Sequence, residues 1–250
     1  MYGNLPRLIG VFCLVLALPA FAAELTRAEV TDLLAHAGKE HPADLRRRDL
    51  TDLDLSGLDF RHADLWGADL RRSNLSGSNL HGLVLDLTVM TKVNLSRADL
   101  ADTSIFGVSL MHANLSRANL SGSRVIAVME GADLSYANLS RVDWAADMKN
   151  QSMGLMRANL KGADLTGADL SGAKLGRAML RHAKLAGASL RGADLFSADM
   201  DGADLSGADA SGANFSDAKL HDAKFVNTRL LGARFDGAVN VPAEVAAGAR

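Results

Sequence analysis

A large apolar side chain, usually leucine, recurs at every fifth position over most of this 250-residue chain. The longest unbroken run of these residues is Leu160, Leu165, Leu170, Leu175, Leu180, Leu185, Leu190, Leu195, Met200 and Leu205. In an α-helix, residues spaced by five lie about 140° apart, so they would form no single buried stripe. In a strand they would alternate between the two faces. The spacing therefore predicts a solenoid, in which each unit makes the same step and the leucines point to one common axis.

Each unit combines one large and one small apolar residue with three polar ones, as in Ala163-Asp164-Leu165-Thr166-Gly167. A small residue two positions before each leucine predicts a narrow core that holds one large side chain per unit. The Asp, Asn, Ser, Arg and Gly residues at the other positions suit solvent and tight turns. The recurring aspartates are therefore interpreted as turn residues and not as a catalytic cluster.

This unit resembles the A-(D/N)-L-x-x repeat of the pentapeptide repeat proteins over residues 41–239. The resemblance implies an all-β fold, a right-handed quadrilateral parallel β-helix with four units in each square coil. It implies less about function, because one fold can support many functions. The best-known members mimic DNA and bind DNA gyrase in the cytoplasm, as dimers with strongly acidic surfaces. This chain carries a formal net charge of only -2, which does not match a strongly acidic surface. A cytoplasmic gyrase-binding DNA mimic is therefore the alternative and not the main prediction.

The two ends depart from the repeat. Residues 1–22 read as a secretory signal peptide, with Arg7, an apolar stretch over residues 8–18, and an A-x-A site at residues 20–22. Cys13, the single cysteine, lies inside this segment, so the mature chain would contain no disulfide. Residues 23–40 are expected to form a capping helix that starts with a Thr26/Glu29 capping box. Residues 240–250 are expected to cap the other end, with a short helix starting at Pro242.

The helix is expected to bury one face against the first coil. The residues assigned to that face are Val30, Leu33, Leu34 and Ala37. Such a cover is needed because an open coil exposes apolar core and unpaired backbone groups.

The five-residue period is disturbed near residues 125–155. The large residue comes one position early at Met129 and returns to the first phase by Leu155. We interpret this as one missing residue near Val125 and one compensating extra residue in a bulge at residues 147–154. Stacking of the coils is expected to continue through both.

Some outward positions carry apolar residues in place of Ser, Arg or Gly. If four units form a coil, residues about twenty apart share a face. The candidate interaction patch defined in this way consists of Trp66, Leu87, Val89, Phe106, Met111 and Ile126, with Val128 beside it. Contiguous exposed apolar area usually marks an interaction site. The alternative is that the N-terminal helix or loops cover the patch.

No catalytic or phosphate-binding motif accompanies the repeat, and a filled solenoid offers no deep pocket. We therefore expect no enzyme activity and no cofactor. His62 and His81 would be outward neighbours on adjacent coils, which leaves a weak metal-binding alternative. A second one is the methionine set Met148, Met153 and Met156 in the bulge. Methionine also fills irregular gaps, which is the simpler reading.

The function expected from the sequence is an exported, non-enzymatic scaffold, periplasmic or extracellular. Its partner is expected to be another protein, with homo-oligomers possible, no nucleic acid and no transmembrane segment in the mature chain. The arginines at the start of the repeat alternate with aspartates, which predicts a solvated mixed-charge face.

Overall fold

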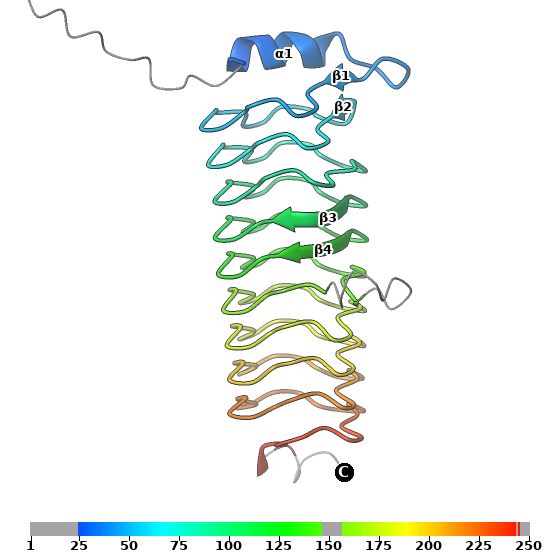
Figure 1. Cartoon of the computed structure of the whole chain (residues 1–250). Helices are drawn as coiled ribbons and strands as arrows, with labels where there is room; N and C mark the ends of the chain where they lie inside the picture. The colour runs from blue at the N-terminus through cyan, green and yellow to red at the C-terminus, as the bar shows by residue number, and fades with distance from the viewer. Residues whose placement is uncertain (1–24, 147–156, 244, 246–250) are drawn as a thin grey trace, which may run out of the picture.

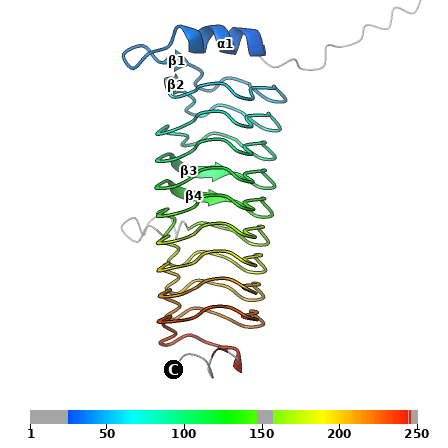
Figure 2. The ribbon, with the colours of Figure 1, turned by 180° about the vertical axis from the view of Figure 1, so that it is seen from behind.

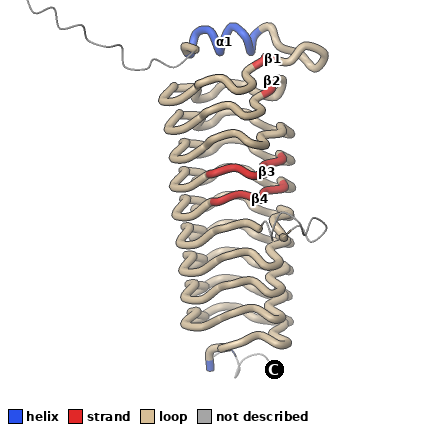
Figure 3. Tube along the Cα trace, in the orientation of Figure 1, coloured by secondary structure: helices blue, strands red, loops and turns tan. Residues whose placement is uncertain are grey.

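The chain winds into a column of stacked coils with one helix lying across its N-terminal end (Figure 1). The computed structural model describes residues 25–146, 157–243 and 245. The helix is α1 (Arg27–Ala35), and the strands are β1 (Ala43–Asp44), β2 (Ala63–Asp64), β3 (Ser104–Ser109) and β4 (Arg124–Val128). Most of the column is drawn as loop, because its coils are joined by isolated bridges and short strands (Figure 3).

All pairing between coils is parallel in the described residues. Strand β1 pairs with β2, and β3 pairs with β4. Isolated bridges continue the pattern: Asn74 pairs with Asn94, and Asn94 pairs with Asn114. Each step equals four of the five-residue units, which therefore make one coil. The view from behind shows the same regular stack (Figure 2). We number the four faces of the column in chain order, and the unit of Leu45 lies on face one.

The core is a stack of leucines separated by small residues. Leu45, Leu65 and Leu85 are buried on face one, and the alanines two positions before the large residues are buried in most coils. Where Ser or Thr replaces alanine, most hydroxyls donate to a backbone carbonyl, as from Thr103 to Leu100 at 2.8 Å, and the Ser123 hydroxyl accepts from Trp144 Nε1 at 3.4 Å. Satisfied hydroxyls of this kind are tolerated inside because no polar group is left without a partner.

The polar positions make the turns that the sequence predicts. The carboxylate of Asp164 accepts a hydrogen bond from the backbone N–H of Thr166 at 3.0 Å, and the same contact recurs at Asp54 and Ser56. In most units the second residue after the large residue adopts a positive φ, as Gly167 does at +65°. This backbone region favours glycine, since other residues bring their Cβ too close to the chain.

The N-terminal helix has the expected capping box, with Thr26 and Glu29 bonded to each other's backbone N–H groups. Val30 is fully buried against the first coil, and Leu34 packs beside it. Leu33 was assigned to the same face but is 37% exposed, because the buried stripe follows Val30, Leu34 and Ala37. At the other end, Ala243 and Val245 are helical and Val245 is buried. Pro242, where the helix was expected to begin, is not helical, and residues 244 and 246–250 lie outside the described residues.

The disturbed period combines the missing residue that was expected with an insertion that is longer than expected. Asn114 pairs with Asp133, so one coil is one residue shorter than four units. Val128 pairs with Asn159, so the next coil is eleven residues longer than four units. The expectation of a single extra residue was wrong, although the stack does continue through both coils. Eleven extra residues shift the phase by one, as a single residue would, because ten of them equal two whole units.

Candidate interaction site

Both changes of coil length occur at the corner between faces one and two, which we call the first corner. In β3 the corner contains Phe106 and Gly107, and the β3–β4 register shifts at this point. In β4, Ile126 is followed directly by Ala127, with no residue opposite Gly107. Ile126 was predicted to face solvent but is only 3% exposed. The shortened corner draws its side chain inward, so it must be removed from the exposed patch.

The residues added in the long coil fall between Ala146 and Arg157, at the same corner. The last described residue before the gap, Ala146, donates its N–H to Gly176 of the next coil at 3.1 Å. The first described residue after the gap is Arg157, and Asn159 donates its N–H to the carbonyl of Ala127 at 3.0 Å. The expected bulge and its methionines, Met148, Met153 and Met156, lie outside the described residues. The flanking coils therefore remain joined through the backbone on both sides of the insertion.

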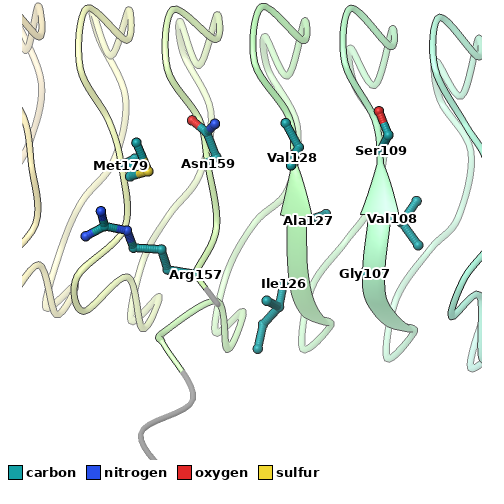
Figure 4. A pocket seen from close by; sticks show the side chains of 9 residues that line it. All are labelled: Gly107, Val108, Ser109, Ile126, Ala127, Val128, Arg157, Asn159 and Met179. Atoms are coloured by element: carbon teal, nitrogen blue, oxygen red, sulfur yellow. The ribbon is translucent and has the colours of Figure 1, made fainter. Parts of the chain in front are cut away.

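The shortened corner leaves a hollow of about 520 Å³ beside strands β3 and β4 (Figure 4). Its lining residues are Gly107, Val108, Ser109, Ile126, Ala127, Val128, Arg157, Asn159 and Met179. Val108, Ile126 and Ala127 are buried and supply apolar surface, whereas Val128 is 39% exposed. Within the described parts of the chain, the guanidinium of Arg157 makes no hydrogen bond or ion pair. Among the described residues, the site thus combines an apolar floor with one cation that has no partner.

The expected patch forms a band that leads to this hollow. Leu87 is 50% exposed at the first corner. Its side chain lies close to Gly107 of the next coil, since a Cβ added to that glycine would be 3.5 Å from Leu87 Cδ2. Val89 is exposed on face two, and Phe106 and Met111 are half-buried. Trp66 is also half-buried, with the guanidinium of Arg47 4.7 Å from its ring centre. Helix α1 lies at the end of the column and does not cover this band (Figure 1).

Sequence reasoning missed Val84, which is more exposed than any residue of the expected patch. The signal was present, because Val84 and Val89 both occupy the position that normally carries the turn-forming Asp or Asn. At these two positions an apolar side chain replaces the carboxylate that elsewhere caps the turn. Val84 and Val89 therefore extend the apolar band along faces one and two.

Most arginines of the first coils are held in ion pairs, as the mixed-charge pattern predicts, whereas Arg47 stacks on Trp66. Arg46 Nε lies 2.9 Å from Asp44, and Arg61 and Arg71 bond Asp59 and Asp69 in the same way. The hydrogen bonds from Arg46 to Asp44 lower the pKa of that carboxyl from 3.8 to about 2. These exposed pairs leave little free positive charge at this end of the column.

The structure does not bring a metal site together from the expected histidines. His62 and His81 are exposed on adjacent coils, and among the described residues no three His, Cys, Asp or Glu side chains form a metal-binding group. The sulfur-based alternative lies outside the described residues, as stated above. In the part of the chain that the structure describes, no helix has the length and apolar character needed to cross a membrane.

The fold and site define a solenoid repeat protein whose coils stack into one column. The family model for pentapeptide repeats matches eight copies within residues 43–125 and 158–239. The chain belongs to the pentapeptide repeat family.

Solved structures of other pentapeptide repeat proteins are similar to this chain. HetL, involved in heterocyst differentiation regulation in the cyanobacterium Nostoc sp. strain PCC 7120, is 31% identical; the match covers 86% of this chain and 94% of HetL, with a TM-score of 0.44. QnrB1, a plasmid-mediated fluoroquinolone resistance protein, is 19% identical over 74% of this chain and 91% of QnrB1, with a TM-score of 0.47. A protein of the Arabidopsis thaliana thylakoid lumen is 37% identical over 34% of this chain and 67% of its own, with a TM-score of 0.30. No curated protein matches the sequence.

Proposed function

We propose that this protein is an exported, non-enzymatic scaffold, a right-handed quadrilateral β-helix that binds another protein through its first corner. The observation that carries the proposal is the convergence of three departures from the repeat at that corner. These are the shortened coil, the eleven-residue insertion in the next coil, and the band of apolar side chains. A repeat array needs none of them for its own stacking, and features that break a local rule without structural gain mark candidate functional sites.

The hollow indicates the chemistry of the partner. Its floor of Val108, Ile126 and Ala127 fits an apolar side chain, and Arg157 at its edge fits a carboxylate beside that side chain. A charge-assisted hydrogen bond to Arg157 would fix the orientation of the partner segment. We therefore expect a partner segment that places Leu, Ile or Phe next to Asp or Glu.

A photo-crosslinking residue at position 128 tests this contact in intact cells. We expect a discrete crosslinked partner from position 128 and none from position 226, where Val226 is an exposed valine far from the corner. In the same assay, Arg157→Glu should reduce the crosslink at position 128 because it reverses the one charge of the hollow. Equal crosslinking from positions 128 and 226 would contradict the proposal.

Export is supported by the sequence of residues 1–22, which lie outside the described residues. Fractionation combined with N-terminal sequencing tests it. A periplasmic or secreted protein that begins at Ala23 is the expected result. An uncleaved cytoplasmic protein would favour the gyrase-binding alternative, although the near-neutral charge of the chain gives little support to a DNA mimic.

A further inference from the structure

A second group of side chains lies away from the first corner, where faces three and four meet. We call this the third corner, and it contains the positive-φ residue that ends each unit of face three. Down the column these residues are Gly57, Gly77, Arg97, Arg117, Tyr136, Gly167, Gly187, Gly207 and Asn227. Arg97 and Arg117 therefore occupy neighbouring coils at a position where most other coils have glycine.

These two arginines differ from Arg46, Arg61 and Arg71 of the first coils, because no described carboxylate holds them. Among the described residues, neither guanidinium makes an ion pair or hydrogen bond. Both adopt a left-handed backbone, with φ of 59° and 60°. A non-glycine residue there is disfavoured, and no ion pair or hydrogen bond within the described chain compensates for it.

Tyr136 holds Arg117 in place from the next coil. The guanidinium carbon of Arg117 lies 5.1 Å from the centre of the Tyr136 ring, which is a cation–π contact. The ring itself rests on Gly167, since a Cβ at that glycine would come within 2.6 Å of Tyr136 Cε1. Arg117 is thus supported by a stacked aromatic ring, and its hydrogen-bond donors have no partner in the described part of the chain.

Hydroxyl groups complete the surroundings of the two cations. Ser76, Ser96 and Ser116 line a hollow of about 360 Å³ together with Arg97, Arg117 and Asn114. Ser116 donates to Asn114 Oδ1 at 2.7 Å, whereas the hydroxyls of Ser76 and Ser96 have no partner in the described residues. No carboxylate is among its described lining residues. Within the described chain, the site offers several hydrogen-bond donors without partners and no negative charge.

We propose that this hollow binds a phosphate or sulfate group. Two guanidiniums on coils about 4.8 Å apart can approach one anion from two sides. The serine hydroxyls add donors in other directions, which suits the several oxygens of a tetrahedral anion better than the two of a carboxylate. The hollow is open, so the anion can be free or attached to a larger solute. This site is independent of the proposed partner contact at the first corner.

Titration of the full-length protein with inorganic phosphate, sulfate and acetate at constant ionic strength tests the proposal. Calorimetry should detect phosphate and sulfate and give clearly weaker binding of acetate. Arg97→Gln/Arg117→Gln should weaken phosphate binding about a hundredfold, because each charge-assisted hydrogen bond contributes about tenfold or more. The matched control is Lys92→Gln/Lys219→Gln, which removes the same formal charge from another face and should leave binding unchanged.

Two further measurements keep the test decisive. Tyr136→Ala should weaken phosphate binding several-fold, because Arg117 loses its support. Glucose 6-phosphate and vesicles containing phosphatidic acid distinguish a soluble phosphate ester from a lipid headgroup, and tighter binding of either one than of inorganic phosphate supports the site. Absence of phosphate and sulfate binding, or an equal loss in the lysine control, would overturn the proposal.

Discussion

The coils of residues 158–239 and those of residues 63–146 share one core but differ at their surfaces. Leu185 in the later coils and Leu95 in the earlier coils are both fully buried. The later coils place glycine at most of their positive-φ corners, whereas many of the earlier ones have Arg, Lys, Leu, Tyr, His or Asp there. Both changes of coil length also fall in the earlier coils or at their end. Stacking therefore depends on a few inward positions. The corners can vary without loss of stacking and can acquire binding functions.

Truncating one core leucine in each region tests whether the two regions share an equally packed core. Leu95→Ala and Leu185→Ala should each lower the free energy of unfolding by about 2–5 kcal/mol, because both side chains are fully buried. Chemical denaturation measures the loss. A much smaller loss for Leu95→Ala would show that the irregular coils contribute less to the core than their burial indicates.

A glycine pair probes how the two regions meet at Tyr136. Gly162→Ala should cost about 1–2 kcal/mol, because alanine is disfavoured at a positive φ. Gly167→Ala should cost up to about 1 kcal/mol more, since its Cβ would also displace the Tyr136 ring. Thermal or chemical unfolding compares the two variants. Equal costs would mean that the ring does not rest on the later coil in solution.

The apolar band should matter little for stability. Leu87→Ser and Val128→Ser should each change the free energy of unfolding by less than about 1 kcal/mol, because Leu87 is 50% exposed and Val128 is 39% exposed. Val226→Ser in the later coils is the matched control and should behave alike. A loss of more than about 2 kcal/mol at Leu87 or Val128 would give the band a structural role.

The smallest effect concerns the ion pairs of the first coils. The pKa of Asp44 is lowered to about 2 by Arg46, so the pair stabilises the fold above pH 3.8 and its contribution disappears as pH falls towards 2. Asp44→Asn should lower Tm by no more than about 2 °C at pH 6 and by nothing measurable below pH 2. High salt should also reduce the difference at pH 6. A difference that persists below pH 2 would exclude the ion pair as its cause.

The sequence was sufficient to predict the column, its core and the turn role of the aspartates, because each follows from a strict local period. It could not predict the insertion, since a phase read in steps of five cannot distinguish one extra residue from eleven. The burial of Ile126 was missed for a related reason. From the sequence, the missing residue near Val125 could precede or follow Ile126. Only the β3–β4 register shows that it is missing after Ile126, at the position opposite Gly107.

The hollow at the first corner could not be predicted, because it depends on how a short coil lies between two longer ones. The arginine pair could have been found. Arg97 and Arg117 are separated by four units, which is one full coil, and the units that contain them carry Asn and no Asp. The general abundance of arginine and aspartate in the repeat concealed that local exception.

The pairing of Val128 with Asn159 also bears on how the protein folds. Pairings that do not span the insertion close a segment of four units or one residue less, whereas this pairing closes a segment eleven residues longer. Loop-closure entropy grows only with the logarithm of length, so the longer segment adds about 0.4 kcal/mol. The coils before and after the insertion can therefore nucleate separately. Their later pairing is slowed little by the longer segment between them. A segment of new sequence can enter the chain at this corner without slowing the assembly of either region.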